Sequence, residues 1–266
     1  MCTGDGLRFR RAERAIPLRG DERKPDGYGF DDFLRIANSD GISHWRAEDR
    51  DCEIDLRLEE FLPRIRTIDA WGFENESVRQ DAANHYEVAG VVRGRVRIGE
   101  AEHSVACLGY RDHSWGNRSW GFSNHRWFSG SFGPDFSFSI ATAIAKSVGY
   151  FQGGYIAKDG VVDPMTRADV LVHLEDDGIT SRGGRVICET KHFGRFEFEV
   201  ETLDCVLLET DHHVGSEALS KVICDGRVGT CDLEISNNPR DGRAAPSVIL
   251  GAASENGLSR RAAFRL

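Results

Sequence analysis

Apolar and polar residues alternate with a period of two along much of this chain. Residues 52–59 alternate Cys, Ile, Leu and Leu with charged side chains, and residues 196–202 alternate Phe, Phe, Val and Thr with glutamates. This pattern is typical of β-strands that bury one face and expose the other to water. It predicts antiparallel sheet.

Further strands are predicted by the same alternation and by the turn residues between the runs. Asp-Gly pairs, such as those within 158–160 and 225–226, are typical of hairpin turns. No stretch of a dozen residues has a helical period of 3.6, so we expect an all-β fold of antiparallel strands closed into barrels or sandwiches. The further strands are expected at 85–92, 96–98, 102–110, 125–132, 136–144, 150–157, 168–174, 185–190, 218–224 and 228–236.

Length and charge restrict the class of protein. The 266 residues, 40% of them apolar, can form one large all-β domain or two smaller ones. A formal charge of −9 argues against nucleic acid or anionic membranes as partners, because both favour basic surfaces. No apolar run reaches the ~20 residues of a membrane span, and the amino terminus lacks the apolar segment of a secretory signal. We therefore expect a cytoplasmic protein.

The seven cysteines are scattered along the sequence and form no close pairs. This spacing indicates neither a disulfide framework nor a zinc site, so we expect no bound metal and interpret the cysteines as small buried apolar residues. Asp211, His212 and His213 resemble a ligand cluster. Adjacent histidines in a strand point to opposite sides, however, and a solvated loop is the simpler interpretation.

The predicted strand at 136–144 has one face made only of small residues. Phe, Phe, Ile, Thr and Ile alternate there with Ser137, Ser139, Ala141 and Ala143. A face of small side chains either packs closely against another backbone or leaves space for an apolar ligand. We favour packing and keep ligand binding as the alternative.

The chain's densest chemistry lies in residues 110–121, which read Tyr-Arg-Asp-His-Ser-Trp-Gly-Asn-Arg-Ser-Trp-Gly. They begin an aromatic region, 115–138, that contains eight Trp and Phe residues. In an extended strand, successive side chains point to opposite sides. One side of this strand can therefore carry chemistry while the other supports it. The first side holds Arg111, His113 and Trp115, and the second holds Tyr110, Asp112 and Ser114.

Acid-base chemistry is one interpretation of this segment. His113 suits proton transfer because imidazole has the side-chain pKa nearest neutrality. Asp112 can act as an acid if burial raises its pKa, or can orient an imidazole if it stays ionised. The indoles of Trp115 and Trp120 can stabilise developing positive charge.

Structural roles are the alternative for each residue taken alone. An Arg-Asp pair is commonly a salt bridge, a single histidine is commonly a hydrogen-bonded core residue, and Trp-Gly pairs commonly mark tight corners. Because these groups occur together among aromatic residues, we interpret the segment as a functional site.

Several motifs resemble those of a known protein family. They are Tyr-Glu-Val at 86–88, Gly-Arg-Val at 94–96, and the run at 109–118 followed by Trp120. Together they resemble the AttH-like group of the carotenoid 1,2-hydratase superfamily, in the calycin class. The resemblance implies two successive lipocalin-like β-barrels, with the motif near their junction and facing a hydrophobic pocket.

The resemblance also predicts a domain organisation. We expect a flexible segment at 1–25, a first barrel domain at 26–121, a second at 122–240 and a tail at 241–266. The first region is short for a complete barrel, so that barrel is expected to be trimmed or partly open.

In the carotenoid hydratases, the motif histidine and the tryptophan two positions later are implicated in protonating an alkene. Those positions correspond to His113 and Trp115, and Asp112 and Arg111 match the same motif. The chain departs from the hydratases on a later strand, where they use Tyr and Asp and residues 136–140 read Phe-Ser-Phe-Ser-Ile.

The resemblance and the residues together predict an enzyme without a cofactor that hydrates, cyclises or isomerises an isoprenoid, steroid or polyketide-like molecule. His113 would donate or relay the proton, Asp112 would tune it, and Arg111 would anchor a substrate oxygen. The alternatives are a lipophile carrier without chemistry and a degenerate interaction module, and fold analogy cannot choose among them. The remaining pocket residues are expected to be Trp115, Trp120, Trp127, Tyr110 and Arg118.

Overall fold

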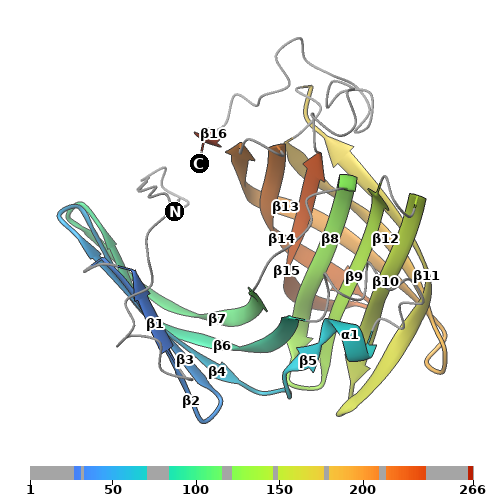
Figure 1. The fold of residues 1–266 in the computed structure, drawn as a ribbon, viewed down its shortest axis with the longest axis horizontal. Helices are drawn as coiled ribbons and strands as arrows, with labels where there is room; N and C mark the ends of the chain where they lie inside the picture. The colour runs from blue at the N-terminus through green and yellow to red at the C-terminus, as the bar shows by residue number, and fades with distance from the viewer. Residues whose placement is uncertain are drawn as a thin grey trace. The chain divides into compact units, whose positions relative to one another are not determined.

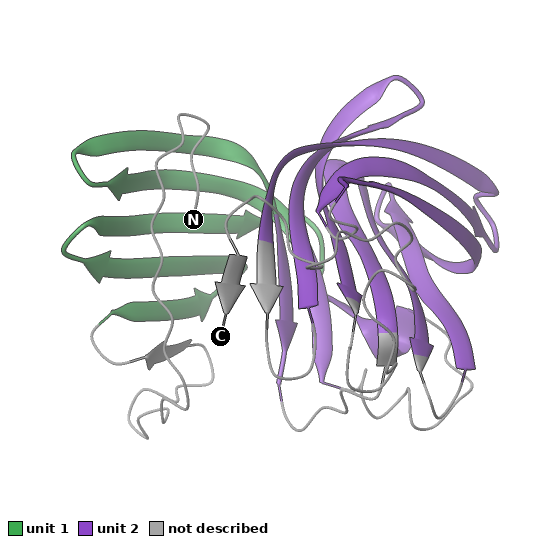
Figure 2. Cartoon of the chain, turned by 90° about the horizontal axis from the view of Figure 1, so that it is seen from above, with its two compact units in different colours: residues 1–63, 89–109, 266 green, residues 64–88, 110–265 purple. Residues whose placement is uncertain are grey.

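The computed structural model describes residues 27–30, 33–70, 84–115, 122–145, 149–176, 180–209, 214–237 and 263–265. The chain divides into two compact units, which are coloured separately in Figure 2. Unit 1 comprises Met1–Pro63, Ala89–Gly109 and Leu266, and unit 2 comprises Arg64–Val88 and Tyr110–Arg265. The domain boundaries given above stay a prediction. No helix among the described residues is long and apolar enough to cross a membrane.

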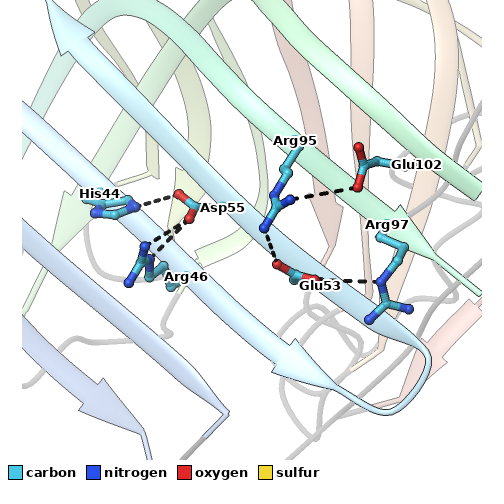
Figure 3. Close-up of polar contacts among 7 residues, drawn as sticks. All are labelled: His44, Arg46, Glu53, Asp55, Arg95, Arg97 and Glu102. Atoms are coloured by element: carbon cyan, nitrogen blue, oxygen red, sulfur yellow. Dashed lines mark hydrogen bonds and ion pairs between the residues drawn. The ribbon is translucent and has the colours of Figure 1, made fainter.

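Unit 1 is built on an open antiparallel sheet. The hairpin between β2 and β3 turns at Asp40 and Gly41, whose φ angles of 48° and 77° suit a tight two-residue turn. On one face of the sheet, Asp55 pairs with both His44 and Arg46 (Figure 3). Further ion pairs surround Glu53 on the same face. The sheet comprises β1 (Gly27–Phe30), β2 (Leu34–Ser39), β3 (Ile42–Asp49), β4 (Cys52–Glu60) and parts of β6 (His85–Ile98) and β7 (Ala101–Ser114).

Unit 2 contains a closed eight-stranded barrel (Figure 1). Each strand pairs antiparallel with the next, and β15 returns to pair with β8. The ends of β6 and β7 that belong to unit 2 accompany the barrel, together with β5 (Ile65–Arg66) and the short helix α1 (Thr67–Ala70). The barrel strands are β8 (Phe122–Gly133), β9 (Phe136–Ala145), β10 (Gly149–Lys158), β11 (Val161–Leu174), β12 (Ser181–Thr190), β13 (Arg195–Glu209), β14 (Val214–Cys224) and β15 (Arg227–Asn237).

Phenylalanines fill one half of the barrel interior. The rings of Phe128 and Phe138 stack with centroids 4.5 Å apart, and Phe198 lies 4.8 Å from Phe138. Inward and outward side chains alternate along each strand, so burial of these rings fixes the register of β8, β9 and β13. The outward side chains of the same strands lie outside this apolar core.

The all-β prediction is confirmed. One closed antiparallel barrel and one curled, open sheet match the expected pair of lipocalin-like barrels with an incomplete first member. The two strands expected at 85–92 and 96–98 form the single strand β6. The predicted flexible ends lie outside the described residues, except that 263–265 form β16 (Ala263–Arg265), which pairs with β13.

The interpretation of the cysteines as buried is wrong in part, and the structure decides between the two interpretations of the small face of β9. Cys107 is exposed, because its position on β7 faces solvent, whereas the other described cysteines are buried as expected. The small face of β9 packs: Ala141 contacts a cluster that includes Ile65 and Tyr155, and Ser139 is fully buried. Packing against the preceding segment therefore explains the small residues.

Candidate functional site

The candidate site lies on the outward face of β8, β9 and β10, within unit 2. Phe128, Phe138 and Ile156 point into the barrel core, so their neighbours Trp127, Ser139 and Tyr155 point outward. There they meet Glu87, which the unit 2 part of β6 supplies.

Glu87 is a fully buried carboxyl group held by three donors. Its Oε1 accepts hydrogen bonds of 2.9 Å from Trp127 Nε1 and from the Ser139 hydroxyl. Its Oε2 accepts one of 3.1 Å from the Tyr155 hydroxyl. Burial raises the pKa of Glu87, while the nearby His85 and the hydrogen bonds oppose this shift. Glu87 is thus a proton-binding group enclosed by protein.

Two tyrosines extend this network. The hydroxyls of Tyr110 and Tyr155 lie 2.8 Å apart. Burial, followed by the charge of Glu87, raises both tyrosine pKa values well above the ordinary value of 10. Both phenols therefore stay protonated at neutral pH and can act as hydrogen-bond donors.

A histidine-aspartate pair lies beside Glu87. His85 Nε2 and Asp112 Oδ2 are 2.6 Å apart, and the His85 ring packs 5.1 Å from the ring of Trp127. His85 is buried, whereas Asp112 is exposed. Asp112 is thus the solvent-facing end of a group of ionisable residues that is otherwise buried.

The opposite face of β6 and β7 carries a separate aromatic cluster. Tyr86 stacks on His113 with ring centroids 5.2 Å apart, and Trp115 lies 5.2 Å from His113. The Arg111 guanidinium lies 5.4 Å from the centre of the Tyr86 ring, and Arg111 Nη2 is 3.0 Å from His113 Nδ1.

The electrostatics of His113 follow from that contact. Arginine can only donate, so His113 Nδ1 accepts and any remaining ring proton lies on Nε2. Burial and then the charge of Arg111 lower the pKa of His113 below 6.5. His113 is therefore mostly neutral at pH 7, which suits a hydrogen-bond donor or base better than an acid.

The structure separates the predicted site residues between two faces, as the alternation along the strand predicts. Tyr110 and Asp112 join Glu87, whereas Arg111, His113 and Trp115 join Tyr86. Asp112 bonds to the imidazole of His85. The catalytic roles inferred from the resemblance stay predictions. Trp127 donates a hydrogen bond to Glu87. Arg118 and Trp120 lie outside the described residues.

Sequence reasoning overlooked His85, Glu87 and Tyr155 as members of this site. A signal was present at 85–88, where His85 and Glu87 alternate with Tyr86 and Val88 directly before an apolar run. An acidic residue in that setting indicates either a surface strand or a buried carboxyl. Only the partners on β8, β9 and β10 decide between them.

More carboxyl groups line the outward face beyond Asp112. Burial raises the pKa of Glu217 and of Asp232, which share a hydrogen bond, and the charge of Asp112 adds to both shifts. Glu234 pairs with His125 at 2.6 Å. The face is therefore acidic from β14 to β7 and favours protonated or cationic groups near Asp112.

His85, Glu87 and Asp112 have the donor set of a metal site. One ligand atom from each lies within 4.8 Å of the others. The Glu87 oxygens already accept three hydrogen bonds, however, and His85 Nε2 is bonded to Asp112. A metal ion would have to displace these bonds, so we interpret the arrangement as one for sharing protons.

Known structures share this fold. The AttH-like protein NE1406 of Nitrosomonas europaea superposes with a TM-score of 0.57 at 13% identity, covering 80% of this chain and 70% of that one. Kievitone hydratase of Nectria haematococca superposes with a TM-score of 0.52 at 13% identity, covering 76% and 68%. The resemblance to the AttH-like and hydratase superfamily is thereby confirmed as a likeness of fold.

Sequence comparison places the chain more specifically. No curated protein matches it in sequence. The profile of a family described as a domain of unknown function, DUF7064, matches residues 1–239, which is most of the chain. The chain belongs to the DUF7064 family.

Proposed function

We propose that this protein is an acid-base enzyme of the hydratase type that acts on a hydrophobic small molecule containing a carbon-carbon double bond. The observation that carries the proposal is a fully buried carboxyl, Glu87, beside a His85–Asp112 pair whose aspartate reaches solvent. Perturbed ionisable groups with one accessible member are typical of catalytic sites. The fold shared with kievitone hydratase supports the reaction class.

Hydration forms one C–H bond and one C–O bond and consumes one water molecule. In the proposed reaction, a proton shared between His85 and Asp112 passes through Asp112 to one alkene carbon. A water oxygen then bonds to the other carbon, and the Asp112 carboxylate takes the proton that this water loses. Asp112 is thus restored, and the reaction uses water and side chains of this protein.

The neighbouring groups would support Asp112 in both of its states. His85 Nε2 lies 2.6 Å from Asp112 and can donate to the carboxylate form. Glu87, whose pKa is raised by burial, lies close to this pair and can bind a proton there. Trp127 packs against His85 and presents an aromatic surface beside the acid.

The aromatic cluster on the opposite face gives a rival location for the chemistry. The family resemblance assigns proton transfer to His113 and substrate anchoring to Arg111. The neutral state of His113 and its contact with Arg111 instead favour a supporting role. Substitutions on each face distinguish these locations.

The test is hydration in isotopically labelled water. Purified protein is incubated with kievitone, isoprenoid polyenes and steroids in ¹⁸O water, and the products are measured by mass spectrometry. We expect a product that contains the label with the wild type and with His113→Ala, and none with Asp112→Asn. Label incorporation that survives Asp112→Asn but fails in His113→Ala would move the chemistry to the opposite face. Binding without conversion of any candidate would support the lipophile carrier.

A further inference from the structure

The interior of the unit 2 barrel differs between its two halves. The half near the short turns at 134–135 and 225–226 is filled by phenylalanines. In the other half, which we call the polar half, an apolar cluster of Cys205, Val214, Ala218 and Ile235 lies beside inward polar side chains from both walls. They include Asn124, Arg126 and Thr142 on β8 and β9, and Ser181, Thr202 and Ser220 on β12, β13 and β14.

Strand register places Arg126 inside the barrel. It pairs with Thr142 of β9 and with Ile235 of β15, both of which are buried. It also lies two positions from Phe128, which belongs to the core cluster. Side chains two positions apart point to the same side of a strand, so the guanidinium is directed inward.

Arg126 has no anionic partner among the described residues. Arginine elsewhere in the barrel is paired, as Arg227 is with Asp135 at 2.6 Å. Burial lowers the pKa of Arg126, and the interaction with Tyr150 opposes this shift. A charged group that is removed from water without a partner reduces stability. Such a residue is expected where a ligand supplies the missing charge.

Asn124 gives a second, independent indication of a ligand. Its side chain is only 2% exposed, and its Oδ1 has no hydrogen-bond partner within the described part of the chain. Asn124 occupies the next inward position of β8 after Arg126, toward the end of the barrel. Two adjacent inward positions therefore offer unused hydrogen-bonding capacity.

The other wall of the polar half is a belt of buried hydroxyl groups that bond mainly to one another. Thr202 Oγ1 lies 3.1 Å from Ser181 Oγ and 3.4 Å from Ser220 Oγ. Because these groups are small and mutually satisfied, they contribute a polar lining without a competing negative charge. No inward carboxylate in the described part of this half would repel an anion.

Apolar side chains lie at the end of the barrel nearest Asn124. Ile144 is paired with Asn124 on one side and with Tyr150 on the other, and both Ile144 and Tyr150 are exposed. A ligand reaching Arg126 from this end would pass both of them. The sequence of groups from the end inward is thus apolar, then amide, then cation.

We propose that the polar half of the barrel binds an apolar carboxylic acid, with the carboxylate on Arg126 and Asn124 and the apolar part against Ile144 and Tyr150. Arg126 can donate two hydrogen bonds to a carboxylate. This site is inside the barrel, whereas Glu87 and Asp112 are associated with its outward face, so the two proposals stand independently.

The test is calorimetric titration with decanoate, with decanol as the uncharged match. The wild type binds decanoate more tightly than decanol, and Arg126→Met weakens decanoate binding at least about tenfold while leaving decanol binding unchanged. Arg126→Met also raises the melting temperature, because it removes a partly buried charge that has no anionic partner among the described residues. The matched control is Arg227→Met, which removes a paired arginine at the other end of the barrel and leaves decanoate affinity unaltered.

Two further variants guard against a folding defect. Arg126→Lys keeps the charge and retains part of the affinity, and Asn124→Leu reduces it with Arg126 intact. The proposal is overturned if decanoate does not bind the wild type, or if it binds Arg126→Met as tightly as the wild type.

Discussion

Two histidine-aspartate pairs in this molecule have the same nitrogen-to-oxygen distance but lie in different surroundings. His44 and Asp55 in unit 1 are 2.6 Å apart, as are His85 and Asp112 in unit 2. The side chains of the first pair are 21% and 28% exposed, whereas those of the second are 3% and 48% exposed. The second pair therefore joins a buried imidazole to an accessible carboxylate.

The two pairs also differ in the ionisable side chain that lies next to them. Arg46 contacts Asp55 at 3.1 Å, as Figure 3 shows. The His44 hydrogen bond, and then Arg46, lower the pKa of Asp55 despite partial burial. The group near the other pair is the buried acid Glu87, whose pKa is raised. A short histidine-aspartate distance alone therefore does not distinguish the two pairs, whereas the pKa shift of the neighbouring carboxyl does.

The largest expected effect is on stability, from removing the Glu87 carboxyl. Glu87→Ala leaves the donors of Trp127, Ser139 and Tyr155 buried without their acceptor, so the free energy of unfolding falls by about 3 kcal/mol or more. Asp55→Ala in the ion pairs of unit 1 lowers it by at most about 1 kcal/mol. Urea denaturation measures both. Equal losses would show that the two networks do not differ in burial energetics.

The next effect is on turnover. With a substrate from the hydration assay, Asp112→Asn lowers the rate about 100-fold or more, because the amide cannot exchange a proton as the acid does. Asp55→Asn has the same change of chemistry in a pair of the same length and leaves the rate unaltered. A rate that survives Asp112→Asn would contradict the proposed acid, provided that circular dichroism shows an intact fold.

Loss of a single hydroxyl is expected to have a smaller effect. Tyr155→Phe removes one donor to Glu87 and the contact with Tyr110, and it lowers the free energy of unfolding by about 1 kcal/mol. Tyr150→Phe, at an exposed tyrosine of the same strand, is the matched control and changes stability little. The same denaturation curves distinguish the two variants.

The smallest effect is a difference in pH dependence between the two carboxyls. The pKa of Asp55 is lowered by folding, so its stabilising contribution is present above its unfolded value near 3.8 and is lost as the pH falls through the folded value. Raised pKa values act in the opposite direction, so the contribution of Glu87 is present below about 4.5 and is lost as the pH rises through its folded value. Stability measured against pH for Asp55→Asn and Glu87→Gln, each relative to wild type, should therefore change with opposite sign.

The strands that the sequence predicts well are those with a clean alternation. β13 follows its Phe-Glu pattern, and the small face of β9 packs as favoured. β3 was not predicted because its burial contradicts residue polarity: Ser43 is fully buried, whereas Ile42 and Trp45 are exposed. Neighbouring elements, and not the local pattern, decide which face of β3 is covered.

The site was predictable only where its residues are close in sequence. The run at 110–115 shows Asp112 and the two faces directly. The alternation at 85–88 does not reveal that Glu87 is buried, because its partners Trp127, Ser139 and Tyr155 lie 40, 52 and 68 positions away. Their meeting depends on the register among β8, β9 and β10, which is set by the barrel core.

Closure of the barrel has a consequence for the order of folding. His125 and Glu234 are partners although 109 positions separate them, because the last barrel strand pairs with the first. Contacts of such range form slowly, since a long loop must be closed before they add stability. During synthesis, Glu87 emerges before every one of its donors and stays hydrated until they arrive. The enclosed acid therefore loses its hydration only when β8, β9 and β10 have joined β6.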